Sequence, residues 1–264
     1  MRLPLLIVVL SVPSLLLSLA ATAGNCRLDT RHSTATRTVT QVIDGDTLEL
    51  SSGIRIRMLG IDTPELGKDG EADQPYARAA RQALYHLLKS AGFQVRLVYG
   101  TQKEDRYRRW LAHVFTRDGR NLQQQLLLRG LAFNLPFPPN LRYQDCYRQA
   151  EHRARHARRR LWGSAAGKPV AESSLTRYSR TGYRLVRGTV SRVYFGRRSV
   201  WINFTHRRLS VRIARQDLKY FRGKDLGRLR GRTIVVRGYM TPSYSRRYPN
   251  YFYMRLRHRD SLID

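Results

Sequence analysis

Acidic residues are scarce in this sequence, and so are lysines. Its 264 residues include 19 Asp and Glu against 49 Lys and Arg, a formal net charge of +30. All but six of the basic residues are arginines, whose planar guanidinium groups suit phosphate better than an ammonium group does. This excess predicts a polyanionic partner. A hydrophobic content of 42% with 10% aromatic residues excludes a disordered polycation and predicts at least one folded core.

Long apolar runs are absent beyond the first 20 residues, so we expect no membrane span in the mature chain. At the N-terminus, Arg2 precedes an apolar run over residues 5–19, and the small residues Ala21-Thr22-Ala23 follow it. This pattern is typical of a signal peptide over residues 1–23, cleaved before Gly24, and it predicts a periplasmic or secreted protein. An uncleaved membrane anchor is the alternative.

Cysteine is limited to Cys26 and Cys146. In an oxidising compartment we expect the two to form a disulfide, which would disfavour the unfolded chain by closing a long loop. Two free thiols are the alternative.

The composition changes after Trp162. Residues 163–182 are rich in small, polar and helix-breaking residues, which is typical of a linker. We therefore expect a first domain over residues 24–163, a linker over 164–182 and a second domain over 183–264. Residues 164–264 hold 24 basic and 5 acidic residues, a net charge of +19, whereas residues 24–163 have a net charge of +10. This asymmetry predicts different roles for the two domains.

The pattern of apolar residues predicts a β-rich α+β protein. In the first half we expect strands at 38–43, 48–50, 54–58, 93–99 and 110–116. A helix should begin near Pro75, a short one should end before Gly130, and a basic one should span 143–160. In the second half we expect strands at 183–194, 200–204, 209–213, 233–239 and 251–256. A short helix at 216–221, between the third and fourth of these strands, favours a smaller OB-like barrel.

Four acidic residues lie close together where predicted strands end: Asp44, Asp46, Asp62 and Glu65. Isolated acids on turns are usually only solvated. A cluster of carboxylate and carbonyl oxygens, however, suits Ca²⁺. Two carboxylates ~4 Å apart would repel each other by ~4 kcal/mol at an effective dielectric constant of about 20. Their crowding therefore predicts a bound cation.

Three segments of the first half resemble the staphylococcal nuclease (thermonuclease) family. They are Val42-Ile43-Asp44-Gly45-Asp46-Thr47, Arg57-Met58-Leu59-Gly60-Ile61-Asp62-Thr63-Pro64-Glu65 and Asp105-Arg106-Tyr107-Arg108-Arg109-Trp110-Leu111-Ala112. The resemblance covers roughly residues 39–162. It implies a Ca²⁺-dependent phosphodiesterase that acts on DNA and RNA, leaves 3′-phosphate ends, and is built on an OB-fold barrel with three helices.

The same resemblance implies roles for individual residues. Asp46 and Asp62 would bind Ca²⁺ through their carboxylates, and Thr63 through its main-chain oxygen, with Asp44 close by. Glu65 would take a proton from the attacking water. Arg57 and Arg109 would hold the phosphate.

Two departures from the family pattern concern substrate contacts. The family usually has Tyr-Gly-Arg where this chain has Tyr107-Arg108-Arg109; the register of the following Leu111-Ala112 favours Arg109 over Arg108 as the phosphate ligand. Tyrosines that flank the nucleotide in the family fall near residues 135–138, where Phe137 is the remaining aromatic residue able to stack.

Aromatic residues alternate with arginines in the second half. About half of these rings should fill the core, and the remainder, especially within 239–253, fit a nucleic-acid platform. The residues we expect to bind there are Tyr244, Arg246, Arg247 and Tyr248. The sequence implies a nucleic-acid substrate, DNA or RNA, and gives no indication of a protein partner. The alternative function is a catalytically weak nuclease-like protein that only binds nucleic acid or an acidic cell-surface polymer.

Overall fold

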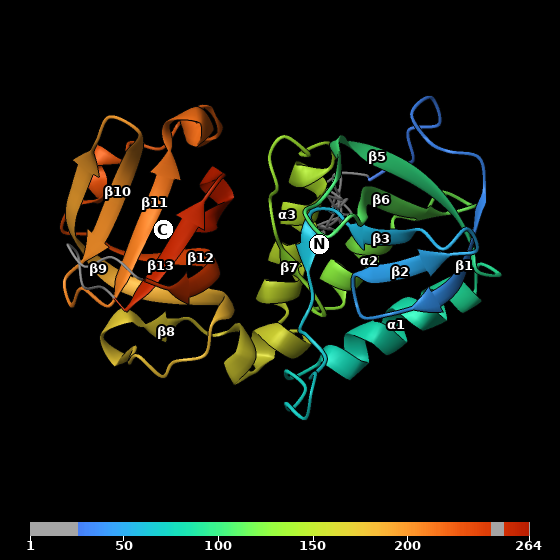
Figure 1. The fold of residues 1–264 in the computed structure, drawn as a ribbon, viewed down its shortest axis with the longest axis horizontal. Coiled ribbons are helices and arrows are strands. Elements are labelled where there is room, and N and C mark those ends of the chain that lie inside the picture. The colour runs from blue at the N-terminus through green and yellow to red at the C-terminus, as the bar shows by residue number, and fades with distance from the viewer. Residues whose placement is uncertain (1–25, 244–250, 264) are drawn as a thin grey trace, which may run out of the picture.

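Two closed β-barrels lie side by side in the computed structural model, which describes residues 26–243 and 251–263 (Figure 1). The expected signal peptide over residues 1–23 lies outside the described residues. So do Tyr244, Arg246, Arg247 and Tyr248, the expected nucleic-acid platform.

The first barrel is closed by five strands. They are β1 (Arg37–Val42), β2 (Thr47–Leu50), β3 (Arg55–Met58), β5 (Gln94–Glu104) and β6 (Trp110–Thr116). Around the barrel they follow the order β1-β2-β3-β6-β5, with β3 and β6 parallel. The period-2 alternation in β3 has the expected result: Ile56 and Met58 point into the core, and Arg57 points away from it.

Three helices accompany this barrel: α1 (Ala77–Lys89), α2 (Leu122–Leu128) and α3 (Gln144–His156). A short ladder of β4 (Ile61–Asp62) and β7 (Phe133–Asn134) lies beside them. This agrees with the expected OB-fold barrel with three helices. No helix in the described part of the chain has the length and apolar character that a membrane span requires.

The last helix is shorter than the sequence pattern predicts, because it ends at His156 and not at Arg160. Arg158 and Arg160 have left-handed backbones, with φ of 48° and 44°, which an α-helix does not accommodate. Nη1 of Arg159 donates to the Leu128 carbonyl (2.7 Å), and Nη1 of Arg160 to the Arg129 carbonyl (2.8 Å). These arginines therefore cap the carboxyl end of α2 instead of extending α3.

The predicted disulfide is confirmed. Cys26 and Cys146 are bonded, and both are almost completely buried. The bond joins the segment before β1 to the first turn of α3.

The second barrel repeats the strand order of the first. Its strands are β8 (Val170–Ala171), β9 (Gly182–Phe195), β10 (Ser199–Phe204), β11 (Leu209–Ala214), β12 (Thr233–Pro242), β13 (Phe252–Leu256) and β14 (Leu262–Ile263). Five of them close as β9-β10-β11-β13-β12, because β12 also pairs with β9, and β11 and β13 are parallel. The helix expected at 216–221 is a 3₁₀-helix, η4 (Arg215–Phe221).

The segment expected to be a linker is partly structured. It contains the 3₁₀ turns η2 (Ala165–Gly167) and η3 (Glu172–Ser174), and its strand β8 pairs with β9. Further 3₁₀ turns are η1 (Arg160–Gly163), η5 (Gly227–Leu229) and η6 (Arg259–Ser261).

A buried ion pair joins the two barrels. Nη1 of Arg237, on β12, lies 2.6 Å from Oε2 of Glu151, on α3, and each side chain is only 3% exposed. The other Glu151 oxygen accepts a hydrogen bond from the backbone N–H of Asn134 (2.7 Å), and Nε of Arg237 donates to the Asp260 carbonyl (2.8 Å).

An apolar cluster also joins the two halves of the chain. Phe133 and Leu161 of the first half pack with Tyr183, Leu185 and Val235 of the second half. Because side chains alternate along a strand, Val235, Arg237 and Tyr239 leave β12 on the same face. That face of β12 is therefore the one applied to the first barrel.

Glu151→Ala should lower the free energy of unfolding by about 3–5 kcal/mol, because it leaves Arg237 as a buried charge without its partner. The double substitution Glu151→Leu with Arg237→Met should recover most of the loss, since neither residue then has a charge to desolvate. Urea unfolding followed by circular dichroism measures both changes.

Asp145→Ala is the matched control, since Asp145 lies on the same helix and its ion pair with Arg148 is exposed. It should change the free energy of unfolding by less than about 1 kcal/mol. A Glu151→Ala loss no larger than this would contradict the importance of the ion pair.

Candidate active site

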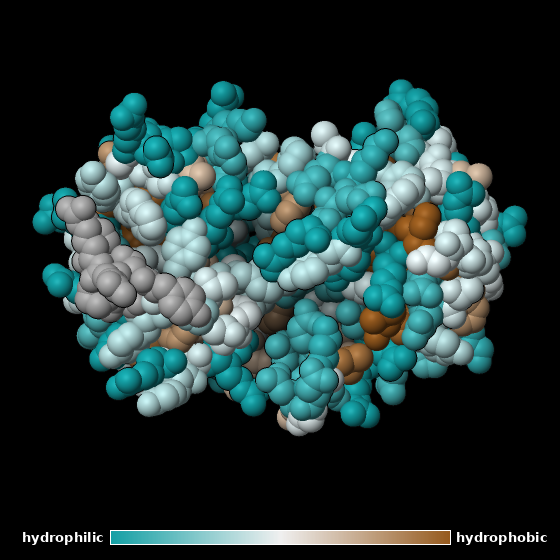
Figure 2. Space-filling view, viewed as in Figure 1, coloured by the Kyte–Doolittle hydropathy of each residue, from teal (hydrophilic) through white to brown (hydrophobic). Residues whose placement is uncertain are grey.

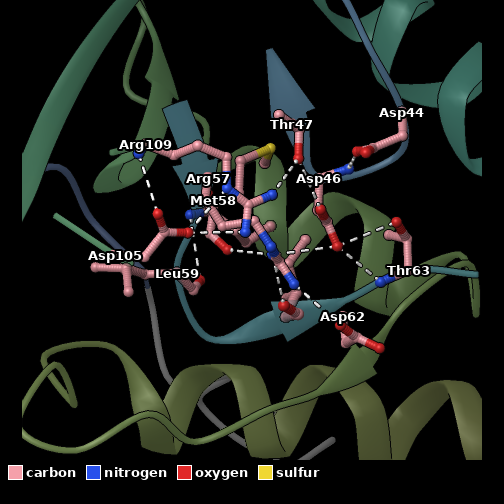
Figure 3. Close-up of polar contacts among 12 residues, drawn as sticks. Asp44, Asp46, Thr47, Arg57, Met58, Leu59, Asp62, Thr63, Asp105 and Arg109 are labelled. Carbon is pink, nitrogen blue, oxygen red and sulfur yellow. Dashed lines mark hydrogen bonds and ion pairs between the residues drawn. The ribbon is translucent and has the colours of Figure 1, made fainter. Parts of the chain in front are cut away.

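The acidic cluster is built on two connections of the first barrel. Between β1 and β2, Oδ1 of Asp44 accepts a hydrogen bond from the backbone N–H of Asp46 (2.9 Å), which fixes a tight turn. Gly45 is required in this turn, because a Cβ there would lie 2.7 Å from Ala80 Cβ and Thr63 Oγ1. Asp62 ends the short strand β4, and its Oδ1 accepts a hydrogen bond from Nη2 of Arg57 (Figure 3).

Arg57 lies at the centre of the cluster (Figure 3). Its Nη1 is 3.1 Å from Oδ2 of Asp46, and its Nη2 is 2.9 Å from Oδ1 of Asp62. Nη1 also donates to the carbonyls of Met58 (2.9 Å) and Ile61 (3.0 Å). A single guanidinium group thus holds the two carboxylates side by side.

The position of Arg57 changes what the crowding of the carboxylates implies about a bound metal. We expected the crowding of Asp46 and Asp62 by itself to require a cation. Arg57 already supplies one positive charge between them, so their proximity does not demonstrate a metal. Arg57 was expected to hold phosphate, and in this structure its terminal nitrogens bind protein oxygens.

Burial dominates the electrostatics of the cluster. It raises the pKa of Asp46 to about 8, although the charge of Arg57 opposes this rise. It also raises the pKa of Asp62, against the opposing effects of Arg57 and a hydrogen bond from Tyr239. The carboxylates in turn raise the pKa of Arg57, which therefore stays charged. Asp46 and Asp62 are both buried beside this one arginine, whereas Asp44 is only partly buried.

The groups expected to bind a metal ion near the Asp44–Asp46 turn are all oxygen donors. Oδ2 of Asp46 accepts hydrogen bonds from the backbone N–H (2.9 Å) and the hydroxyl (3.2 Å) of Thr63, so the expected ligands Asp46, Asp62 and Thr63 are neighbours. This set suits an oxygen-preferring cation such as Ca²⁺. Across residues 26–243 and 251–263, however, no group of three or more His, Cys, Asp or Glu side chains is arranged to hold a metal ion.

The cluster opens into a groove of about 1280 Å³ whose walls come from both barrels. The surface is hollowed between the two lobes of the molecule (Figure 2). Asp44, Asp46, Glu65 and Arg109 line the groove on the side of the first barrel.

Glu65 stands at the wall of this groove, and its side chain is more exposed than those of the aspartates. Partial burial and the negative charges of Asp62 and Asp44 raise the pKa of its carboxyl group. Among the described residues its carboxylate has no hydrogen-bond partner, whereas its backbone N–H donates a hydrogen bond to Oε1 of Gln74 (3.2 Å). A water molecule in the groove can therefore approach Glu65.

The structure separates the two candidate phosphate ligands. Arg109 lines the groove, with its guanidinium 2.8 Å from Oδ2 of Asp105 and its Nη1 3.5 Å from the hydroxyl of Thr47. Arg108 is exposed outside the groove lining and has a left-handed backbone, with φ of 61°. Glycine adopts this conformation readily, which fits the Tyr-Gly-Arg pattern usual at this position.

Phe137 lines the same groove, and the guanidinium of Arg257 lies 4.7 Å from the centre of its ring. An arginine of the second barrel thus already covers the ring that we expected to stack on a base.

Tyr239 is a site residue that the sequence analysis did not assign to the acidic cluster. Its hydroxyl, on β12 of the second barrel, donates a hydrogen bond to Oδ1 of Asp62. Burial and the charge of Asp62 raise the pKa of Tyr239, so the hydroxyl stays protonated and remains a donor. The two residues are 177 positions apart, and no local pattern links them.

Comparison with known proteins agrees with the family resemblance that the sequence motifs of the first half indicate. The family model described as "Staphylococcal nuclease homologue" matches residues 55–164. The chain is 35% identical over 130 residues to a thermonuclease of Staphylococcus hyicus, covering 48% of this chain and 75% of that protein. It is 35% identical over 127 residues to a thermonuclease of Staphylococcus intermedius, covering 47% and 74%.

A more distant relative is endonuclease YncB of Bacillus subtilis, 33% identical over 132 residues, with 48% of this chain and 62% of that protein covered. The family match lies within the first barrel and its helices and does not extend over the second barrel. On the strength of the first half, the chain belongs to the staphylococcal nuclease family.

Proposed function

We propose that this protein is a Ca²⁺-dependent nuclease, exported to the periplasm or the medium, that hydrolyses phosphodiester bonds of DNA and RNA and leaves 3′-phosphate ends. Family membership and the nuclease names of its relatives support a hydrolase that cleaves nucleic acid. The observation that carries the proposal is the pair of carboxylates held by Arg57, of which Asp46 lines the same groove as Glu65 and Arg109.

Each residue has a task that its chemistry suits. Asp46, Asp62 and the main-chain oxygen of Thr63 would hold the cation, with Asp44 fixing the turn that carries Asp46. When bound, Ca²⁺ supplies positive charge against the negative charge that grows on the phosphate during hydrolysis. Glu65 takes the proton of the attacking water, since its carboxylate is open to the groove.

The two arginines provide the remaining positive charge. Arg109 reaches the groove from the loop between β5 and β6, and its planar fork matches two phosphate oxygens. Arg57 keeps the carboxylates in place, and the phosphate would approach it from the same groove. Both groups would stabilise the negative charge that grows on the phosphate in the transition state.

Export is supported by the disulfide, which persists in an oxidising compartment. The excess of arginine over acid in the second half supports a role for the second barrel in holding the polyanionic substrate.

Glu65→Gln should lower kcat on DNA in the presence of Ca²⁺ by about 10²- to 10⁴-fold, because the amide cannot accept the proton of the water. Product formation measured by gel electrophoresis with end-group analysis gives both the rate and the position of the phosphate. Glu71→Gln, at another groove residue, is the matched control and should keep the wild-type rate. Wild-type protein that binds DNA and never cuts it would instead support the purely binding alternative.

Ca²⁺ should raise the unfolding temperature of the wild-type protein, because a ligand that binds only the folded state stabilises it. Asp62→Asn should remove most of this rise, since it takes one carboxylate from the donor set. Differential scanning calorimetry with Ca²⁺ and with chelator measures the rise independently of activity. Asp69→Asn, an exposed aspartate on the loop after β4, should retain it. Equal rises in the two variants would contradict the assignment of Asp62.

A further inference from the structure

A stripe of aromatic and arginine side chains crosses the outer face of the second barrel. Cross-strand pairing places Tyr194 beside Trp201 and Trp201 beside Arg212, and β11 continues this row to Arg255 on β13. The intervening residues Val200 and Ile202 point inward and are buried. We call this row, with Tyr253 and Tyr239, the aromatic–arginine stripe. Its members are Tyr194, Trp201, Arg212, Arg255, Tyr253 and Tyr239.

Contacts join the central members of the stripe. The rings of Trp201 and Tyr253 lie 6.2 Å apart, and the guanidinium of Arg212 lies 6.0 Å from the ring of Trp201. Tyr194 is 51% exposed and Tyr239 is 45% exposed, so the aromatic surface at both ends of the stripe is open to a ligand. Arg255 is paired with Asp217 at 2.8 Å, and Arg212 binds only the hydroxyl of Ser199 (2.6 Å) among the hydrogen bonds of the described residues.

The stripe leads into the candidate active site. Tyr253, Arg255 and Tyr239 line the groove between the barrels, and Tyr239 reaches Asp62. The row also crosses β10 and β11, the second and third strands of the barrel, which form the face on which OB folds bind oligonucleotides.

We propose that the aromatic–arginine stripe binds a single strand of nucleic acid and directs it into the groove at Asp62. The occupant is single-stranded because the rings can stack only on bases whose faces are not covered by a paired duplex. Arg212 faces the phosphates of the same strand. The proposal rests on the proposed function in taking nucleic acid as the ligand, and it assigns the binding surface to β10, β11 and β13.

Trp201→Ala should weaken the binding of a fluorescein-labelled (dT)₁₆ oligonucleotide by about 5- to 150-fold, the loss expected for one stacked base. Fluorescence anisotropy in the presence of chelator measures this binding without cleavage, so the result does not depend on catalysis. Trp201→Phe keeps a ring and should retain most of the affinity, which separates stacking from a loss of folding. Arg212→Ala should also lower the log–log salt dependence by about 0.7.

Tyr85→Ala, at an exposed ring on α1 of the first barrel, is the control for the loss of an aromatic residue. Arg228→Ala, at an exposed arginine on η5, is the control for the loss of charge. Both should bind the oligonucleotide as the wild type does. Unchanged affinity in Trp201→Ala would overturn the proposal, and so would an equal loss of affinity for a duplex of matched length. Wild-type protein that cuts DNA while Trp201→Ala binds normally would leave the nuclease function intact and reject the stripe alone.

The hydrogen bond from Tyr239 to Asp62 carries a second inference. Oδ1 of Asp62 is occupied by Arg57 and Tyr239, whereas Oδ2 has no hydrogen-bond partner among residues 26–243 and 251–263. Two donors on one oxygen fix the rotation of the carboxylate. We infer that Tyr239 is a positioning residue, by which the second barrel orients Asp62 so that Oδ2 is free for the cation.

Tyr239→Phe should weaken Ca²⁺ binding by about 10- to 100-fold, the usual cost of removing a group that orients a metal ligand. Isothermal titration calorimetry with CaCl₂ and no nucleic acid measures this directly. The control is Tyr183→Phe, which removes another hydroxyl between the barrels, one that donates to the Asn134 carbonyl (3.3 Å), and should leave the affinity unchanged.

The possible results separate the role of Tyr239 from the assignment of the cation site. Equal affinity in wild type and Tyr239→Phe would overturn the role of Tyr239 and leave the proposed function standing. A wild-type protein that binds no Ca²⁺ would overturn the cation assignment, and the role of Tyr239 with it.

Discussion

The ion pair between Glu151 and Arg237 is the constraint that sets the two barrels against each other. Both groups are removed from water, so each depends on the other and on its remaining hydrogen bonds to offset the loss of hydration. A one-residue shift in the pairing register of β12 within its sheet would turn Arg237 away from Glu151 and would also turn Val235 and Tyr239 away from the first barrel. Tyr239 stands two positions after Arg237 on the same face of the strand. The contact with Asp62 therefore follows from the position of the ion pair.

The few acidic residues of this basic chain say more about its function than the net charge does. A net charge of +30 predicts only that the partner is a polyanion. The buried aspartates of the first barrel interrupt that charge, and Arg57 neutralises them in part. Basic residues attract nucleic acid wherever they lie on the protein surface, so they do not indicate a particular site. In the proposed function, the acids mark the place where a cation and a phosphate would meet.

Much of the fold was predictable because it depends on local patterns. Alternation placed Ile56 and Met58 inside the barrel, and β6 has the predicted bounds of Trp110–Thr116. The family motifs indicated Asp46, Asp62 and Glu65. Asp46 and Glu65 line one groove, and Asp62 is joined to Asp46 through Arg57. Two features were not predictable from local sequence. The end of α3 depends on arginines that cap another helix, and the position of Tyr239 depends on how two folded units dock.

The repeated strand order shows how one topology serves two kinds of chemistry. The turn between the first two strands carries Asp44-Gly45-Asp46 in the first barrel, whereas the corresponding turn between β9 and β10 carries Gly196-Arg197-Arg198. Carboxylates on that turn can hold a cation, and arginines in the same place would repel one and attract phosphate. The second barrel therefore has the geometry of the first without its means of hydrolysis. In our proposal, the second barrel binds a strand of nucleic acid and presents it to the acids of the first.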